Sequence, residues 1–480
     1  MDEHKDKYKH QVDSVDKLKE KRGQEVISLR KEKREKIVSS KRFRFEDGQA
    51  GGGEHGFTEE MVTDSCKKLQ HSGQEKLPLL QCVRQACAQG VIYIDAFFKV
   101  ENSLQCIVGL LTGNDVELQH EAAWCLTNIS AGNTDHALSV AKSAAPYLIT
   151  YLSSNNPLMQ DQCAWALGNL AGDSPECRTM MQAQGAVVPL VTLLQSPVPA
   201  VVQSAAFALS NIARDSPDVT RELVTAGLVP MLVPYISLAP ENRPILEEVA
   251  WILTYLSTSG EHVPLMIENG LLTSAVSLIV KLQGENPQDV KTVTPLLRCL
   301  GNICSGPNDY TLLALENPRL LHTVGQYLDS SIRHIVKETL WVLSNIVGEP
   351  SVAASVSSGP ILQKVTDKLE DGFDIKQEAL YVLNNLLSHG PEACESLLNH
   401  KVLPAVVPIL KSHDVDVLNL ALAFIEMMLR FNTDCSEVFE SYGGVTRLEG
   451  LEYHSNHTIA EKANSLLEMY FQKENEDVGQ

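Results

Sequence analysis

Along most of the chain, apolar residues recur three or four positions apart, whereas strict alternation bounded by hairpin turns is scarce. This pattern predicts helices rather than strands between residues 57 and 472. A Gly followed by an apolar run with an early Pro punctuates the pattern, as in residues 184–190 (QGAVVPL) and 226–230 (AGLVP), and residues 443–445 (GGV) echo it. Because Gly suits the end of one helix and Pro the first turn of the next, the chain is predicted to be a series of helices joined by tight turns.

One short pattern, an aromatic residue followed four positions later by Asn, recurs at a regular interval. Five copies carry both residues (WCLTN, WALGN, FALSN, WVLSN and YVLNN), and two variants, WILTY and RCLGN, fill the gap between them. The last residues of successive copies are 40 to 47 positions apart, which is the range of armadillo and HEAT repeats rather than of tetratricopeptide or ankyrin repeats. We therefore predict an all-α fold, a right-handed α-solenoid of about ten armadillo repeats, in residues 57–472.

The aromatic residue and its Asn lie on one face of a helix, so stacked repeats would align them in two rows. An Asn amide can bond both the N–H and the C=O of an extended peptide, and an aromatic face attracts Lys and Arg. Carboxylates beside the rows would select cations, and the candidates are Asp173, Glu248 and Glu378. The alternative is that the aromatic residues are core and the Asn residues bond between helices. Seven copies in register favour a site for an extended, basic peptide.

The charge is distributed unevenly along the 480 residues. The net charge is −20, but residues 1–44 hold 15 Lys and Arg against 9 Asp and Glu, so this segment carries +6 and the remainder −26. Such a body should repel nucleic acid and attract cationic ligands, among which its own basic segment is the nearest. We predict a basic arm in residues 1–45, a flexible Gly-rich linker in 46–56 and an acidic tail in 473–480.

Several classes of protein are disfavoured by the sequence. The eleven Cys residues include no C-x-x-C pair or zinc-like spacing, so reduced thiols in an intracellular protein are expected, with no metal and no cofactor. No apolar stretch approaches the roughly 18–20 residues that span a bilayer, and the charged start lacks the apolar core of a signal peptide. Phosphate-binding loops, nucleophile elbows and kinase motifs are missing as well, which predicts that the chain is not an enzyme.

Residues 292–303 (TVTPLLRCLGNI) resemble the repeat of the importin-α family in which Arg replaces Trp, and WILTY resembles the variant with Tyr in place of Asn. Importin-α proteins are adaptors that carry cargo with nuclear localisation signals, and the resemblance covers nearly the whole chain. It implies two peptide-binding sites. The major site would comprise Trp124, Asn128, Trp165, Asn169, Asp173, Phe207, Asn211, Glu248 and Trp251. The minor site would comprise Arg298, Asn302, Trp341, Asn345, Glu378, Tyr381 and Asn385.

The arm resembles the importin-β-binding region of the same family. Its helix-like part would use Leu29, Arg30, Lys31, Lys33 and Arg34, and its signal-like cluster Lys41, Arg42 and Arg44. The resemblance implies that Asp173 pairs with the key Lys of a signal. It also implies importin-β and signal-bearing cargo as partners, an export receptor at the C-terminal end, and a location in cytoplasm and nucleus. Departures from the family pattern would weaken the sites, namely Phe207, Tyr381, Ala137 in place of a Thr and Asn308 in place of an Asp.

We therefore expect a nuclear import adaptor whose arm occupies its own acidic groove until a partner removes it. The alternative is an armadillo scaffold that binds another extended partner and carries no cargo. A nucleic-acid or membrane role for the arm is less attractive beside so acidic a body.

Overall fold

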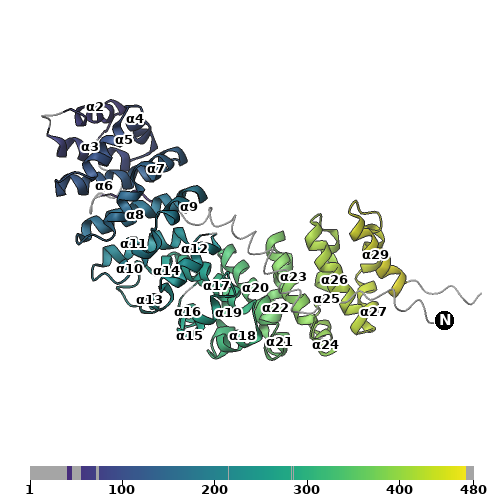
Figure 1. The fold of residues 1–480 in the computed structure, drawn as a ribbon. Helices are drawn as coiled ribbons and strands as arrows, with labels where there is room; N and C mark the ends of the chain where they lie inside the picture. Colours follow the sequence, from purple (N-terminus) through teal and green to yellow (C-terminus); the bar gives the residue numbers. More distant parts are fainter. Residues whose placement is uncertain are drawn as a thin grey trace, which may run out of the picture. The chain divides into compact units, whose positions relative to one another are not determined.

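The computed structural model describes residues 41–45, 56–71, 75–214, 216–282, 284 and 286–471. Every regular element in these ranges is a helix, which confirms the predicted all-α class (Figure 1). The described residues form two compact units, one up to Leu271 and the other from Leu272 onward.

The helices of the first unit are α2 (Glu59–Leu69), α3 (Lys76–Ala88), α4 (Val91–Phe98), α5 (Ser103–Leu111), α6 (Val116–Ser130), α7 (Thr134–Tyr151), α8 (Pro157–Asp173), α9 (Pro175–Ala183), α10 (Val187–Leu193), α11 (Pro199–Ile212), α12 (Pro217–Thr225), α13 (Leu228–Leu232), η2 (Val233–Tyr235), α14 (Leu246–Leu256) and α15 (Val263–Glu268). Those of the second are α16 (Leu271–Lys281), α17 (Pro287–Cys304), α18 (Asn308–Leu315), α19 (Leu320–Tyr327), α20 (Arg333–Ile346), α21 (Pro350–Ser357), α22 (Pro360–Asp367), η3 (Lys368–Glu370), α23 (Phe373–Leu387), α24 (Pro391–Asn399), α25 (Val402–Val406), η4 (Val407–Lys411), α26 (Val415–Phe431), α27 (Asp434–Ser441), α28 (Gly444–Leu451) and α29 (His457–Tyr470).

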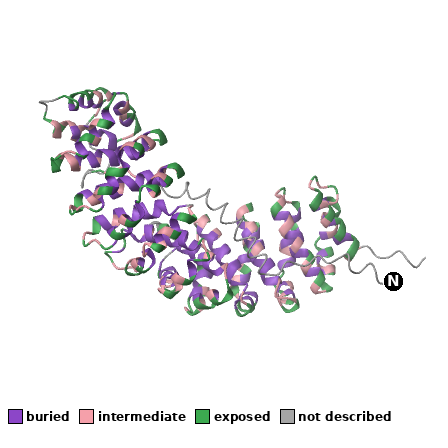
Figure 2. Ribbon diagram, in the orientation of Figure 1, coloured by how far each residue is buried: buried purple, intermediate pink, exposed green. Residues whose placement is uncertain are grey.

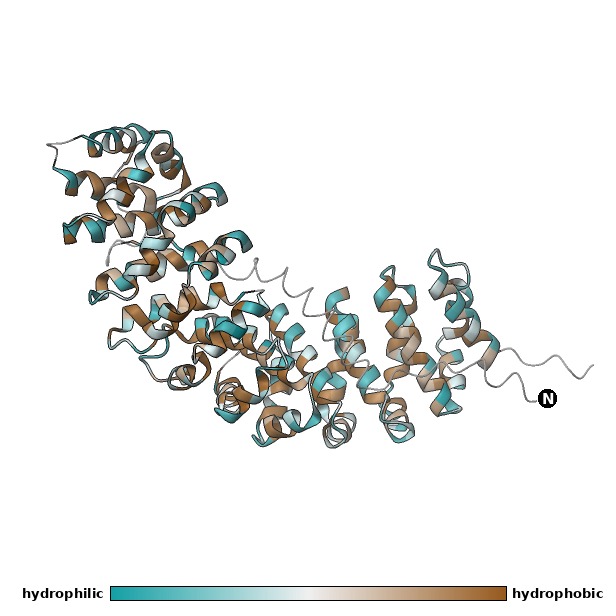
Figure 3. Cartoon of the chain, viewed as in Figure 1, coloured by the Kyte–Doolittle hydropathy of each residue, from teal (hydrophilic) through white to brown (hydrophobic). Residues whose placement is uncertain are grey.

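In each unit one set of helices forms a row in which each packs on the next. In the first unit the row is α3, α6, α8, α11 and α14, and in the second it is α17, α20, α23, α26 and α29. We call these the inner helices. Most of their residues are buried (Figure 2), and apolar residues concentrate along the helices while polar residues gather at the turns (Figure 3). Each aromatic-Asn copy lies on an inner helix, so the repeat seen in the sequence is a repeat in space.

The turns between repeats share a position with left-handed backbone. The φ values of Gly185, Gly227, Gly270 and Gly443 lie between 72° and 83°, a conformation that Gly adopts without strain. Lys401 has a φ of 58° one repeat before Gly443. The Gly residues that the sequence places at helix ends are thus confirmed at 185, 227 and 443.

A second kind of Gly lets consecutive inner helices approach closely. A Cβ added at Gly168 would lie 2.5 Å from the ring of Phe207, and one at Gly301 would overlap the ring of Trp341. The aromatic residue of one repeat therefore rests on the Gly of the preceding repeat. This contact fixes the spacing of the aromatic rows.

The remaining sequence expectations concern thiols and membranes. All eleven Cys residues are free and most are buried; burial raises the pKa of Cys66 to about 12. Among the helices that the structure describes, none combines the length and the apolar character needed to cross a membrane.

Candidate peptide-binding site

Residues 41–44 (KRFR), which we call the basic segment, lie against inner helices α6 and α8 through contacts with the aromatic-Asn rows. We call the aligned residues of these rows the ladder. Trp124 and Asn128 come from α6, whereas Trp165 and Asn169 come from α8. The chain thus folds part of its own basic arm onto the residues predicted to bind a basic peptide.

Asn169 holds the backbone of the segment at Arg42. Its Oδ1 accepts a hydrogen bond from the Arg42 N–H at 2.8 Å, and its Nδ2 donates to the Arg42 carbonyl at 3.0 Å. The same Nδ2 donates to the Thr127 carbonyl on α6 at 2.9 Å. An amide nitrogen has two N–H donors, so one binds the segment while the other joins two inner helices. Asn169 thus makes both kinds of contact weighed from the sequence, one with an extended basic segment and one between helices.

Asn128 repeats the arrangement one repeat earlier. Its Oδ1 accepts from the Arg44 N–H at 2.8 Å, and its Nδ2 donates to the carbonyls of Arg44 and Arg84, both at 3.2 Å. The two clamped residues, Arg42 and Arg44, are two positions apart, as expected for an extended chain whose alternate residues face the same way. Since Arg44 follows Arg42 while α6 precedes α8, the segment runs antiparallel to the order of the repeats.

The two indoles reinforce these clamps. Trp165 Nε1 donates to the Arg42 carbonyl at 3.0 Å, and Trp124 Nε1 donates to the Arg44 carbonyl at 3.2 Å. Each aromatic-Asn pair therefore supplies two donors to one carbonyl and one acceptor to one N–H. None of these bonds depends on the side chain of the residue that is held.

The Lys41 ammonium enters a pocket at the end of α8. It lies 2.7 Å from Asp173 Oδ1 and also donates to the Gly132 carbonyl. Only 2% of the Asp173 side chain is exposed, so the pair is largely shielded from water. Asp173 Oδ2 is buried without a hydrogen-bond partner among the described residues. The buried Ala137 offers no hydroxyl at the position where the resemblance implies Thr.

Both arginines of the segment combine an ion pair with an aromatic face. The Arg42 guanidinium lies 2.6 Å from Glu248 and 4.6 Å from the centroid of the Phe207 ring. The Arg44 guanidinium pairs with Asp161 and lies 4.7 Å and 6.0 Å from the ring centroids of Trp165 and Trp124. Phe207 thus keeps a cation contact although it replaces the Trp of the family pattern.

Sequence analysis missed two contributors to this site, the Gly132 carbonyl and the Asp161 carboxylate. A signal for Asp161 exists, because it precedes Trp165 by four positions and therefore lies on the same helix face. Glu248 stands three positions before Trp251 in the same way. His120 borders the site with its ring 5.9 Å from that of Trp124. Its pKa is lowered, mainly by burial and further by Arg44, although the nearby Glu121 opposes the shift.

Two residues of the predicted major site have other described contacts. Asn211 on α11 donates to the Gly168 carbonyl of α8 at 3.0 Å. This interhelix hydrogen bond is equivalent to those that Asn128 and Asn169 make. Trp251 on α14 stacks on Tyr255 with ring centroids 6.2 Å apart and is buried.

In the second unit, the predicted minor-site residues lie on three consecutive inner helices, α17, α20 and α23. Asn345 donates to the Gly301 carbonyl at 3.0 Å, and Asn385 donates to the Ser344 carbonyl at 2.6 Å. Arg298 forms a buried ion pair with Glu338 at 3.0 Å. The remaining predicted members stand on the same helices; they are Asn302, Trp341, Glu378 and Tyr381.

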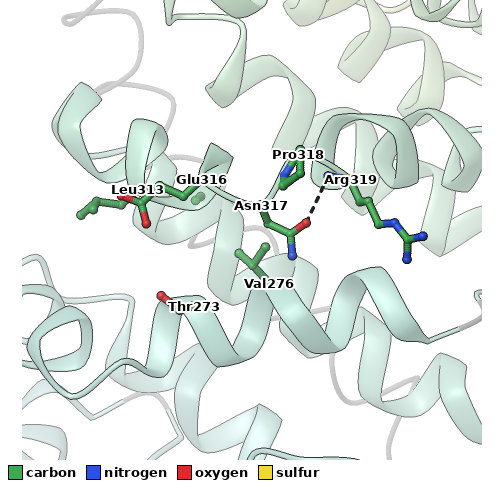
Figure 4. A pocket seen from close by; sticks show the side chains of 8 residues that line it. Thr273, Val276, Leu313, Glu316, Asn317, Pro318 and Arg319 are labelled. Atoms are coloured by element: carbon green, nitrogen blue, oxygen red, sulfur yellow. Dashed lines mark hydrogen bonds between the residues drawn. The ribbon is translucent and has the colours of Figure 1, made fainter.

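Other predicted features lie elsewhere. The importin-β-binding-like residues Leu29, Arg30, Lys31, Lys33 and Arg34 fall outside the described residues. Asn308 is the first residue of α18. A pocket between α16 and the α18–α19 turn (Figure 4) contains none of the predicted site residues. It is lined by Thr273, Val276, Leu313, Ala314, Glu316, Asn317, Pro318 and Arg319.

The fold and the ladder are those of an armadillo-repeat protein, and comparison with known proteins places it further. A family model described as the importin beta binding domain matches residues 4–89, and one described as TMCO6 matches residues 62–472. Importin subunit alpha-9 of Arabidopsis thaliana is 26% identical over 94% of this chain and 94% of its own length. Importin subunit alpha-2 of Oryza sativa subsp. japonica is 28% identical over 94% and 92%. Importin subunit alpha-5 of A. thaliana is 30% identical over 74% and 69%.

A solved structure agrees on the fold. The crystal structure of an engineered protein superposes with a TM-score of 0.76 at 23% identity and covers 85% of this chain and 98% of its own. The chain therefore belongs to the importin-α family of armadillo-repeat proteins, and residues 62–472 also place it in the family described as TMCO6. Residues 147–152 (YLITYL) also resemble transmembrane and coiled-coil domain-containing protein 6. Membership identifies a non-enzymatic protein, as predicted.

Proposed function

We propose that this protein is a nuclear import adaptor that binds extended, basic signal peptides along its ladder and whose own arm competes for that place. One observation carries the proposal: residues 41–44 occupy the ladder with their backbone clamped by Asn128 and Asn169. Their three cations meet Asp173, Glu248 and Asp161.

The basic segment serves as a guide to the ligand. The Asn and Trp bonds hold the peptide backbone and therefore accept any extended sequence. The buried carboxylates impose the choice, because leaving such a charge unpaired in a desolvated site is costly. The favoured ligand carries Lys, Arg, any residue and Arg in that order, and cargo with this pattern would compete with residues 41–44 for the same contacts.

Tethering explains how the arm can regulate the site without high intrinsic affinity. Residues 46–58 connect the segment to α2, and so short a Gly-rich connection would give an effective concentration on the order of millimolar. Cargo at micromolar concentration would be excluded until the arm is withdrawn. The match of residues 4–89 to the importin beta binding domain supports importin-β as the partner that withdraws it.

The proposal also includes a second peptide site in the second unit, a contact for an export receptor and a location in the cell. Asn345 and Asn385 make the same interhelix bonds as the first ladder amides, which supports a second peptide site beside Arg298. The C-terminal end, where Met469 is exposed on α29, is the proposed contact for an export receptor. An adaptor of this kind would move between cytoplasm and nucleus.

Capture of purified importin-β on the immobilised full-length chain tests the adaptor role. We expect binding that is lost when Arg30, Lys31 and Arg34 are all changed to Glu. The same reversal at Lys142, Lys281 and Lys411, which are exposed on the repeats, should leave capture intact. Failure of the unaltered chain to capture importin-β would favour the alternative, an armadillo scaffold for another extended partner.

A further inference from the structure

The aromatic rings of the first ladder alternate with guanidinium groups. The Arg42 guanidinium lies over the Phe207 ring, and the Arg44 guanidinium lies between the rings of Trp165 and Trp124. Each of these two cations comes from the basic segment. The stack does not end there, because a third guanidinium lies on Trp124.

That third guanidinium belongs to the repeats themselves. Arg84 of α3 lies with its guanidinium carbon 4.1 Å from the centroid of the Trp124 ring, closer than that of Arg44. Since α3 and α8 both pack against α6, Arg84 reaches Trp124 from the side of the preceding repeat, while Arg44 reaches it from the side of Trp165. The face that a further ligand cation would use is already occupied.

Arg84 is held firmly in this position. Its Nε donates to Glu121 at 2.7 Å, and only 3% of its side chain is exposed. Glu121 stands three positions before Trp124 on α6, so both lie on the same helix face. The Arg84 carbonyl also accepts a bond from Asn128. One residue thus supports both members of the first aromatic-Asn pair.

The second unit contains the same pair at the start of its own ladder. Arg298 of α17 is bonded to Glu338, which stands three positions before Trp341 on α20. Both ion pairs are buried, and each joins the first Trp-bearing inner helix of its ladder to the inner helix before it. Because the same buried Arg–Glu pair occurs at the start of both ladders, we infer that the two pairs have the same role.

We propose that Arg84, locked by Glu121, is an end-stop that limits the first ladder to three ligand cations and so fixes the register of the bound peptide. The inference rests on the proposed function and specifies its ligand. A residue two positions beyond Arg44 would be the next to face the ladder, and there a basic side chain meets the Arg84 charge instead of an open indole. The residue that follows Arg44, Phe45, is exposed.

The test compares two labelled peptides, KRFRGRG and KRFRGGR, on the full-length chain carrying K41A, R42A and R44A. The peptides have equal charge, but only the first places its additional Arg in the alternate register that faces the ladder. With Arg84 present, we expect the two affinities to agree within twofold. In the charge-neutral variant R84Q/E121Q, the first peptide should bind about three- to tenfold tighter than the second, as an added cation–π contact predicts.

The outcomes separate the two proposals. A preference of threefold or more for KRFRGRG with Arg84 present, or no preference in the variant, would overturn the end-stop. Failure of both peptides to bind either protein would count against the proposed function instead. If R84Q/E121Q does not fold, R84L/E121L replaces the pair by apolar residues and carries the same expectation.

Discussion

Changing Asp173 to Lys should weaken binding of a lysine-rich signal peptide by at least about 100-fold, because removal of one partner from a buried ion pair costs about 3–5 kcal/mol. The Asp173 carboxylate is almost fully shielded and is the group that meets the first cation of the basic segment. A Lys there would place two positive charges in one pocket. The measurement is a fluorescence anisotropy titration on the full-length chain with K41A, R42A and R44A, so that the arm does not compete.

Glu176→Lys is the matched control for this prediction. Glu176 lies on α9, directly after α8, and 61% of its side chain is exposed. The Glu176→Lys substitution makes the same change in net charge close to the ladder, at a residue that does not contact the basic segment. We expect it to change the peptide affinity less than threefold. Equal affinities in the Asp173 and Glu176 variants would show that overall charge, rather than the pocket, attracts the peptide.

Changing Asn169 to Ala should impair both binding and stability, because its amide serves two functions at once. The peptide loses the acceptor and the donor that clamp the Arg42 backbone, which we expect to weaken binding by roughly 10- to 100-fold. The Thr127 carbonyl loses its interhelix donor, which should lower the free energy of unfolding by about 1–2 kcal/mol. Anisotropy and urea denaturation measure the two effects on one protein.

Asn156→Ala separates the two effects of the Asn169 change. Asn156 caps the start of the same helix, α8, by accepting a bond from the Leu158 N–H at 3.0 Å. Loss of such a cap should cost about 1 kcal/mol of stability and leave peptide affinity unchanged. If Asn169→Ala behaves like this control, the amide is a structural bond only and the clamp is not used by ligands.

The fold was predictable because its sequence signal is repeated. An aromatic residue and an Asn four positions apart must lie on one helix face, and recurrence at armadillo spacing makes the faces align. The placement of Gly185 and Gly227 at helix ends follows in the same way from the conformation that only Gly adopts without strain. These inferences need only local geometry and the period.

The site was less predictable, because its remaining features depend on distances between helices. The second role of Asn169 depends on the separation of α6 and α8, which the close contact at Gly168 and equivalent positions sets. Asp161 carries a helical spacing signal, but its pairing with Arg44 requires the register of the segment. Arg84 lies in a helix without an aromatic-Asn copy, and only its position over Trp124 indicates a role.

The most direct test of the account is the affinity of the full-length chain for a lysine-rich signal peptide, with and without the basic segment. K41A/R42A/R44A should bind the peptide roughly 10- to 100-fold tighter than the unaltered chain, because a tethered competitor at about millimolar effective concentration has been removed. The control K5A/K7A/K9A removes three Lys from the same arm and should leave the affinity unchanged. Equal affinities in all three proteins would contradict the claim that the arm competes for the ladder.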